Sequence, residues 1–311
     1  MHSSKSILVT GAAGFLGKEI VRQLNADYRI LTTDLTGNMD FPGDLADPGF
    51  VETLPEADII IHSAAVQYVT PTLPFFRRAP WFHRNNVEAT RNLTARYSGK
   101  AGYFLQVGTS MMYDQTGLAT YRIDSPLKGV GVYSRSKLAS VRLAQGMNNP
   151  VGVMIPCIIG GCGREGLFRR FVETMTRQGF CLLPGSCNHL THMVHVEDAA
   201  SLIHCMVQQE ARGFFNCAGP EPLSIRQWIE IIKDELHLGT IRDIQIPYSF
   251  IRVVACATGY RILAREQQLM LGQSHVLSVD ESLALGWNPH HSNERIVRDI
   301  ARHVAALPNR T

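Results

Sequence analysis

The sequence predicts an α/β protein built on a parallel sheet. Short apolar, β-branched runs at 7–10 and 58–62 indicate buried strands, because central parallel strands are apolar on both faces. Stretches with helical spacing lie between such runs, which is typical of parallel strands joined by helices. Several runs also end in glycine, small or hydroxyl-bearing residues, where open α/β sheets bind ligands. Further strands are predicted over 28–33, 103–107, 151–155 and 214–217.

The first strand leads directly into a glycine turn and a helix. Gly11, Gly14 and Gly17 are spaced by three, and apolar residues then recur at helical spacing up to residue 24. This arrangement presents backbone N–H groups and a positive helix end to a phosphate. The spacing differs from the commonest dinucleotide fingerprint, and a simple tight connection would also explain it.

The second strand ends at Asp34, which follows Gly11 by 23 residues. A carboxylate at this place accepts both ribose hydroxyls of an adenosine and repels a 2′-phosphate, so the sequence favours NAD over NADP. A turn-capping aspartate is the alternative. Asp44 and Leu45 are candidates to lie against the adenine, although Asp44 also suits the cap of a turn or helix.

An unusual segment follows the strand at 58–62. The strand ends in His62, Ser63, Ala64 and Ala65, small enough for a cofactor to cross it. Residues 66–84 then hold three prolines and a cluster of aromatic residues, which predicts a long loop. The aromatic rings would either cover an apolar substrate or pack on the domain or a partner subunit.

A group suited to proton and hydride transfer comes next. Thr109 and Ser110 follow the strand at 103–107, and Tyr133 and Lys137 share one helical face, one turn apart. A free tyrosine has a pKa near ~10, which a nearby ammonium, with the nicotinamide's own positive charge, lowers by stabilising the phenolate. A tyrosine and a lysine at this spacing are commonly a structural pair. Here they follow an N-terminal half with the features of a dinucleotide-binding domain and a strand that ends in hydroxyl residues. This order favours catalysis at an alcohol carbon.

Composition and charge exclude several other classes. The 311 residues are 45% hydrophobic and 18% charged, and the net charge of +3 comes without a long basic run, which argues against nucleic-acid binding. Seven scattered cysteines without a Cys-x-x-Cys pair indicate reduced thiols rather than disulfides or zinc. We therefore expect a cytoplasmic protein without a metal, a signal peptide or an integral membrane segment.

In this order, the motifs TGAAGFLG, Asp34, GDL, HSAA, NNVEAT, GTSMMYD and YSRSK resemble the extended short-chain dehydrogenase/reductases. This is the NAD-dependent epimerase/dehydratase superfamily, which includes a 3β-hydroxysteroid dehydrogenase-like branch. The resemblance implies a Rossmann fold, a doubly wound parallel sheet with helices on both faces, and a small discontinuous C-terminal substrate domain. The Rossmann domain would span 1–156, completed by about 191–220; the substrate-binding part would take about 157–190 and 221–311.

The resemblance also implies site residues, the cofactor NAD and a homodimer. Tyr133 and Lys137 would be catalytic together with Thr109, with Ser110 as the second candidate for the hydroxyl, and with Asn86. The residues implied to contact the cofactor are Gly11, Ala13, Gly14, Phe15, Leu16, Gly17, Asp34, Asp44, Leu45, Ser63, Ala64, Ala65, Lys137 and Pro156.

Departures from the family pattern bear on the small-molecule substrate. Family members that act on sugar nucleotides usually carry arginines where this chain has Leu190–His192 and Ile155, and a glutamate where it has Val141. Because of the missing arginines and the aromatic loop at 66–84, we expect oxidation or reduction of an apolar or steroid-like secondary alcohol or ketone. The apolar and aromatic segment 246–263 also suits a lipophilic substrate; it would alternatively be a core helix, and both could hold at once. The alternatives are a nucleotide-sugar epimerase or dehydratase with tightly held NAD, and a non-catalytic dinucleotide sensor.

Histidines at 189, 192 and 195 are spaced by three. On a helix this spacing would suit a metal, but the surrounding residues are strand-like, and residues three apart on a strand face opposite sides. We therefore expect no metal site there.

Overall fold

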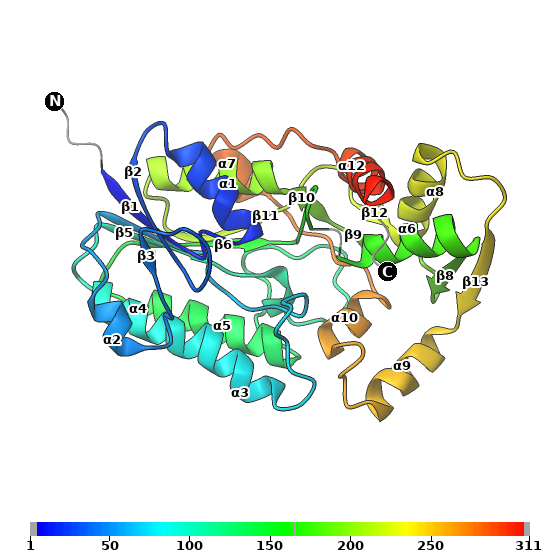
Figure 1. The fold of residues 1–311 in the computed structure, drawn as a ribbon, viewed down its shortest axis with the longest axis horizontal. Coiled ribbons are helices and arrows are strands. Elements are labelled where there is room, and N and C mark those ends of the chain that lie inside the picture. Colours follow the sequence, from blue (N-terminus) through cyan, green and yellow to red (C-terminus); the bar gives the residue numbers. More distant parts are fainter. Residues whose placement is uncertain (1–4, 165, 308–311) are drawn as a thin grey trace.

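The computed structural model describes residues 5–164 and 166–307, without the side chains of residues 166–168 and 170. Its centre is a seven-stranded parallel sheet in the order β11-β6-β5-β4-β1-β2-β3 (Figure 1). The strands are β1 (Ser6–Thr10), β2 (Arg29–Asp34), β3 (Phe41–Pro42), β4 (Ile59–His62), β5 (Tyr103–Val107), β6 (Val151–Pro156) and β11 (Gly213–Cys217). Strand order reverses between β1 and β4, which is where such sheets bind ligands.

Helices cover both faces of the sheet, so the predicted doubly wound α/β fold is confirmed. Helices α1 (Phe15–Leu24) and α7 (Val196–Gln208) pack together on one face. The other face carries α2 (Pro48–Glu52), α4 (Ala89–Tyr97) and α5 (Val132–Gln145) (Figure 1). Each predicted strand begins and ends within one residue of the strand in the structure, because its apolar run is buried in the sheet.

The segment between β4 and α4 is more helical than its prolines suggest. It contains α3 (Arg78–Phe82) and a turn of π-helix, η1 (His83–Glu88), before α4 begins. The Asn86 carbonyl accepts the hydroxyls of Thr90 (2.6 Å) and Ser140 (2.9 Å), and these bonds compete with regular α-helical pairing.

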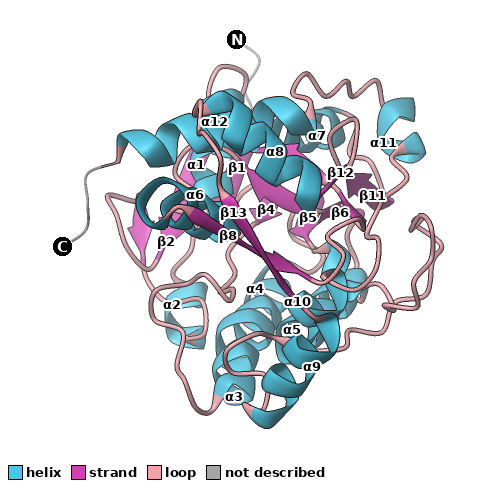
Figure 2. Ribbon diagram, turned by 90° about the vertical axis from the view of Figure 1, so that its right-hand side faces the viewer, coloured by secondary structure: helices cyan, strands magenta, loops and turns pink. Residues whose placement is uncertain are grey.

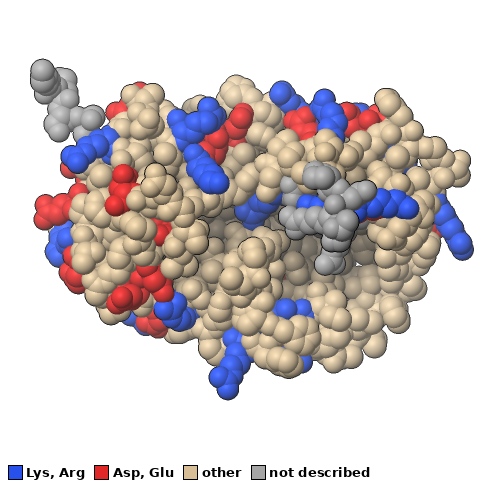
Figure 3. Space-filling model, in the orientation of Figure 1, with Lys and Arg blue, Asp and Glu red and all other residues tan. Residues whose placement is uncertain are grey.

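A second apolar core lies beside the sheet. It is formed by α6 (Gly166–Gln178), α8 (Ile225–Glu235), α12 (Asn293–Ala306) and β8 (Phe180–Pro184), and β8 pairs in parallel with the exposed strand β13 (Arg242–Ile246). A capping box of Ser224 and Gln227 opens α8. Smaller elements connect the two cores: β7 (Ile158–Gly160), β9 (Leu190–Thr191), β10 (Met193–His195), β12 (Leu223–Ser224), α9 (Tyr248–Ala257), α10 (Arg265–Met270), α11 (Asp280–Ala284) and the 3-10 turn η2 (Ser110–Met112). Figure 3 shows a hollow in the surface between the two parts.

The aromatic segments divide between core and surface. Phe82 is fully buried, whereas Phe75 and Phe76 are 55% and 63% exposed. The alternative of a core helix at α9 is wrong, because Ala255 is its one buried residue and Phe250 is exposed. In both ribbon views, α9 and α10 lie on the same side of the molecule as α3 and α5 (Figures 1 and 2). Among the described residues, no helix has the length and apolar character required to cross a bilayer.

Candidate active site

The glycine turn is shaped by close backbone contacts. Gly11 has a φ of +72°, and a Cβ there would meet the Ala64 backbone at 2.7 Å. A Cβ on Gly17 would lie 2.0 Å from the Gly11 carbonyl oxygen. Gly14 caps α1 without a side-chain bond, and the first turn of the helix holds no acid. The start of α1 therefore keeps its N–H groups and positive end available for a pyrophosphate, and the turn fits a dinucleotide.

Asp34 ends β2 beside this turn. Its carboxylate accepts hydrogen bonds from the backbone N–H of Ala13 (3.0 Å) and of Leu35 (2.6 Å). A carboxylate has about four acceptor sites, so these two bonds fix its position and leave capacity for ribose hydroxyls. Asp44 instead accepts from Ala46 N–H (2.8 Å) and pairs with Arg84 (2.6 Å), while the Leu45 side chain is buried in the core.

The ends of the neighbouring strands complete this edge of the sheet. Ser63 donates its hydroxyl to the Thr10 carbonyl (2.7 Å), and Ala64 donates its N–H to the Thr10 hydroxyl (3.3 Å). Pro156 is the last residue of β6 and is buried opposite Cys217. These residues lie where the prediction places them, but their contacts with a cofactor stay a prediction.

Three predicted catalytic side chains meet in a buried site. Tyr133 and Lys137 lie on α5, and Thr109 lies at the end of β5, where its hydroxyl bonds the Tyr133 phenol. All three are less than a tenth exposed. Ser110 is buried directly after Thr109 in η2. Parallel strands deliver such residues to one edge, because their carboxyl ends coincide there.

Burial dominates the electrostatics of this group. Burial raises the pKa of Tyr133 to about 12, against the opposing effects of the Arg164 charge and the Thr109 hydrogen bond. Burial also lowers the pKa of Lys137 to about 8. Desolvation disfavours the charged form of each residue, and the lowering of the tyrosine pKa by Lys137 together with the nicotinamide charge stays a prediction for the site with NAD bound.

Asn86 is committed to positioning. Its side-chain oxygen accepts from Val66 N–H (2.9 Å), and its amide donates to the Val66 carbonyl (3.2 Å) and the Ser136 hydroxyl (2.9 Å). These bonds join the start of the loop at 66–84 to α5. The structure thus supports a role in holding α5 in place, and a direct part for Asn86 in the chemistry stays a prediction.

Two residues that sequence reasoning missed support the Tyr133 end of α5. Glu266, fully buried on α10, accepts from the Ser134 N–H (3.0 Å) and hydroxyl (2.9 Å) and from the Tyr68 hydroxyl (3.1 Å). The Tyr68 ring lies 5.7 Å from that of Tyr133 and 5.3 Å from that of Phe82. No local motif marks Glu266, because its partners are more than 130 residues away in the chain.

Arg164 is a third missed residue. Its guanidinium donates to the Gln67 side chain (2.5 Å) and lies 5.8 Å from the centre of the Phe15 ring. Its charge also acts on Tyr133, and burial lowers the pKa of Arg164 itself. The structure thus places a cation between the glycine turn and the predicted catalytic tyrosine. Arg164 belongs to a glycine-rich connection whose sequence does not indicate a catalytic role.

His62 lies under the site as a neutral side chain. Its ring nitrogens bond the hydroxyls of Thr10 (2.7 Å) and Thr90 (2.9 Å). Complete burial, with a smaller effect from the Lys137 charge, lowers its pKa to about 3. The motif HSAA was noted for its small residues, and the part of His62 in this network follows only from the three-dimensional contacts.

The three histidines spaced by three do not form a candidate metal group among the described residues. They lie near β9 and β10, as the strand-like surroundings predicted. His195 instead stacks on His291, with ring centres 4.0 Å apart, and ligand atoms of these two and Glu197 lie within 4.8 Å of one another. His195 already accepts the Glu197 N–H, and His291 contacts Asp198, so local bonds account for the cluster.

Comparisons with known proteins agree with this geometry. The chain is 26% identical to the low-salt glycan biosynthesis protein Agl12 of Haloferax volcanii, over 93% of this chain and 94% of that protein. It is 27% identical to a dTDP-glucose 4,6-dehydratase of Streptomyces griseus, over 73% and 77%. The solved structure of MoeE5 in complex with UDP-glucuronic acid and NAD shares the fold, with a TM-score of 0.77 and 21% identity over 96% and 99% of the chains.

The family model described as the NAD dependent epimerase/dehydratase family matches residues 7–218, which span the whole parallel sheet. That match, together with a glycine turn and an acidic strand end that fit a dinucleotide, confirms the predicted enzyme class and cofactor. The chain belongs to the NAD-dependent epimerase/dehydratase family.

Proposed function

We propose that this enzyme oxidises and re-reduces a secondary alcohol carbon of a nucleotide sugar, with Tyr133 as the acid and base. The observation that carries the proposal is the meeting of Tyr133, Lys137 and Thr109 at one buried strand edge, next to a turn that fits NAD. NAD, when bound, accepts and returns the hydride; the protein residues move the accompanying proton.

The side chains divide this work. The Tyr133 phenolate takes the proton of the substrate hydroxyl, and the Thr109 hydroxyl holds the substrate oxygen beside it. The Arg164 charge favours the phenolate, and Lys137 adds a second positive charge one helical turn away. Since burial outweighs the Arg164 charge and the Thr109 hydrogen bond, so that the pKa of Tyr133 is about 12, the further positive charge of the nicotinamide is necessary for Tyr133 to act as a base near neutral pH.

Arg164 also supports an anionic substrate. Segments 190–192 and residue 155 lack the arginines that sugar-nucleotide enzymes usually carry, and burial lowers the pKa of His192 to about 4, which keeps that side chain neutral. Arg164 supplies a cation from a different segment, next to Tyr133. Together with the nucleotide sugars named for the relatives, this cation favours a substrate with a phosphate or carboxylate group.

The residues after Thr109 favour epimerisation or simple redox over dehydration. Elimination of water needs an acid and a base in addition to the tyrosine, to remove a C–H proton and protonate the leaving hydroxyl. Ser110 and Met111 follow Thr109 and carry no carboxylate. Glu266 is already bonded to Tyr68 and Ser134.

A second candidate is the net oxidation or reduction of an apolar alcohol or ketone. The exposed rings of Phe75 and Phe76 at the edge of the loop at 66–84 favour it, as do the missing arginines. No observation favours the steroid nucleus over another apolar group. The non-catalytic sensor hypothesis has nothing in its support, because Tyr133 and Lys137 are both present.

The test uses UDP- and dTDP-hexoses with a small fraction of one equivalent of NAD. We expect many turnovers of sugar per NAD without accumulation of NADH. NMR of the sugar carbons measures the turnover. Tyr133→Phe should lower turnover by about 100-fold or more while NAD still binds, and Tyr28→Phe is the matched control. Stoichiometric NADH from an apolar alcohol, with no change in any nucleotide sugar, would transfer the assignment to the second candidate.

The homodimer and the cytoplasmic location expected from the sequence stay predictions. So does the assignment of substrate binding to about 157–190 and 221–311. Sedimentation of the purified protein over a range of concentrations tests the dimer.

A further inference from the structure

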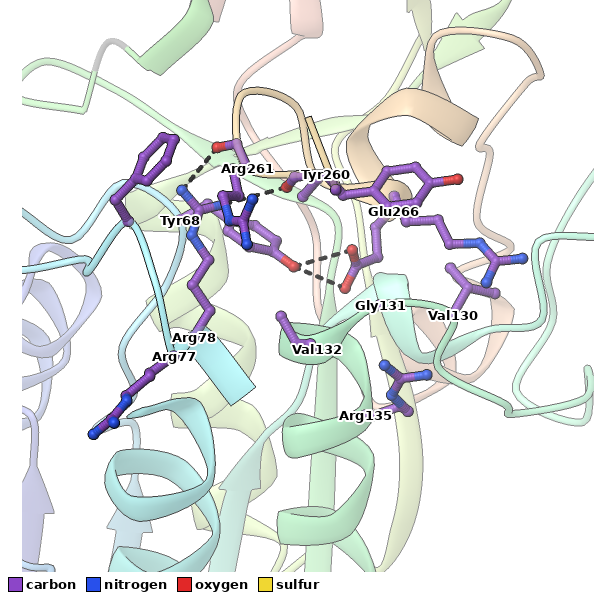
Figure 4. A pocket seen from close by; sticks show the side chains of 14 residues that line it. Tyr68, Arg77, Arg78, Val130, Gly131, Val132, Arg135, Tyr260, Arg261 and Glu266 are labelled. Carbon is purple, nitrogen blue, oxygen red and sulfur yellow. Dashed lines mark hydrogen bonds between the residues drawn. The ribbon is translucent and has the colours of Figure 1, made fainter. Parts of the chain in front are cut away.

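A cavity of about 300 Å³ lies beside the predicted active site (Figure 4). Its walls come from the loop at 66–84, the first turn of α5, and the connection between α9 and α10. Tyr68 and Glu266 form one side of it, and the Tyr68 ring packs on Tyr133. None of the residues predicted to contact NAD or to act in catalysis lines this cavity.

The cavity is strongly basic. Five arginines line it, against the single carboxylate of Glu266. That carboxylate is buried and accepts from Tyr68 and Ser134, so it points away from pairing with the arginines. Among the described residues, no ion pair joins any of the five arginines to an acid. The arginines are Arg77, Arg78, Arg135, Arg261 and Arg265.

The five arginines have different roles. Arg78 donates to the carbonyls of Pro74 (3.1 Å), Tyr260 (3.3 Å) and Arg261 (2.7 Å), which ties the loop to the α9–α10 connection without neutralising its charge. The Arg261 guanidinium lies 4.8 Å from the centre of the Phe76 ring. Arg78 and Arg261 thus form one wall, which Figure 4 shows on one side of the Tyr68–Glu266 contact.

Arg135 lies on the other side of that contact, and Arg77 points away from the cavity (Figure 4). Arg265, next to Glu266 in the chain, also lines the cavity. In the described part of the chain, the guanidinium groups of Arg135 and Arg265 have neither a hydrogen-bond nor an ion-pair partner. Arg135 is also in the first turn of α5. Unpaired arginines that flank a concavity are suited to bind a phosphate, which offers acceptors for their forked donors.

The rim of the cavity is apolar. Phe75 lines the cavity, and the neighbouring Phe76 and Ile262 are 63% and 68% exposed. A free inorganic anion would gain nothing from these side chains. An anion with an apolar part would cover them and use the basic walls at the same time.

We propose that this cavity, here termed the arginine pocket, binds the phosphate group of an amphiphilic molecule. Arg135 and Arg265 hold the phosphate, and the apolar part of the ligand lies along Phe75, Phe76 and Ile262. Because the Tyr68 side chain separates the arginine pocket from Tyr133, this site is distinct from the site proposed for the redox reaction.

The test is calorimetric titration of the full chain with bound NAD. The probes are decyl phosphate below its micelle concentration, inorganic phosphate, and the neutral amphiphile octyl glucoside. We expect one equivalent of decyl phosphate to bind, and to bind about tenfold more weakly or worse in the double variant Arg135→Gln/Arg265→Gln. The matched control is Arg29→Gln/Arg212→Gln, which removes the same charge from exposed sites outside the pocket.

Several outcomes would overturn the proposal. Equal weakening in both double variants would mean non-specific attraction, and equal binding of octyl glucoside would mean an apolar surface alone. If inorganic phosphate bound as tightly as decyl phosphate, the apolar rim would not contribute to binding. Tyr133→Phe separates this proposal from the redox function, since it should abolish turnover and leave decyl phosphate binding unchanged.

Discussion

Two helices begin at the predicted active site. The first turn of one has no side-chain hydrogen-bond partner, and the first turn of the other is bonded to a carboxylate. The start of α1 is capped by Gly14 without a side-chain bond and has no acid in its first turn. The start of α5 is closed by the buried Glu266 carboxylate, which accepts from the Ser134 N–H. Both ends carry the positive potential of a helix N-terminus. One is left open for an exchangeable anion, and the other is filled by a fixed one.

The difference separates binding from positioning. An open helix start can receive a phosphate and release it, which suits a cofactor or substrate. A helix start filled by a side chain is rigid, and here it fixes the helix that carries Tyr133 and Lys137. At Gly131 a Cβ would come within 1.8 Å of the Glu266 carboxylate, so a glycine permits this close approach.

The largest expected effect comes from blocking the turn before α1. Gly11→Ala adds a Cβ at 2.7 Å from the Ala64 backbone, at a φ of +72°. We expect a loss of about 3 kcal/mol or more in the free energy of unfolding, from overpacking and backbone strain together, and loss of NAD binding. Urea unfolding and NAD titration measure the two effects.

Gly99→Ala is the matched control for that change. Gly99 has nearly the same φ, +70°, and a Cβ there meets nothing within 4 Å. We expect a loss of only about 1 kcal/mol, from backbone strain alone. Similar losses in the two variants would show that the contact with Ala64 is unimportant.

Removal of the fixed acid at α5 should have the next largest effect. Glu266→Ala leaves the buried Ser134 N–H and the Tyr68 hydroxyl without their acceptor, at a cost of about 2–3 kcal/mol in the free energy of unfolding. Turnover should fall while NAD affinity is unchanged. Glu266→Gln keeps one acceptor oxygen and should restore part of both properties. If Glu266→Ala weakened NAD binding instead, the separation between the two helix starts would be wrong.

A fall in pH should lower the free energy of unfolding through His62, which lies beneath the site near the N-terminus of α1. The pKa of His62 is lowered from 6.5 to about 3 in the folded protein, so between these values the unfolded chain binds the proton and the folded chain does not. Stability is therefore present above pH 6.5 and is lost as the pH falls, by about 2 kcal/mol between pH 7 and 5 from this group. Urea titrations at both pH values measure the loss. His62→Gln, which keeps two polar groups, should show a correspondingly smaller pH dependence.

The smallest expected effect comes from a change of charge beside the uncapped, positive N-terminus of α1. Lys18 is exposed near the start of α1, and Lys18→Glu places an acid close to the positive helix end. We expect stabilisation of the helix by about 0.3–1 kcal/mol and a weaker NAD affinity by a factor of a few, because the new carboxylate competes with the pyrophosphate. Arg22→Glu, at the last turn of the same helix, should weaken the helix and leave NAD affinity unchanged; equal effects on NAD from both would indicate long-range charge alone.

Residues close together in the sequence account for what could be predicted. The glycine turn, the acid at the end of β2 and the Tyr133–Lys137 pair are each local patterns, and backbone periodicity fixes their geometry. The strand bounds followed for the same reason, since each buried strand is a continuous apolar run. The net effect on the Tyr133 pKa was not predictable, because it depends on burial by segments far away in the chain.

The aromatic loop shows the limit most clearly. Its composition left open whether the rings pack or cover a ligand. In the structure Phe82 is buried against Tyr133, while Phe75 and Phe76 are exposed, and their part in covering a substrate stays a prediction. Arg78 ties this loop to carbonyls more than 180 residues away, a contact that the composition of the loop does not reveal.

The sequence by itself determined the α/β class, the family, the NAD cofactor and the predicted group of Tyr133, Lys137 and Thr109, because each depends on short-range spacing. Tertiary structure decided the rest: Glu266 at the start of α5, Arg164 beside Tyr133, and the arginine pocket. These features join side chains from distant segments, and their charges matter only once folding has buried them or left them without partners.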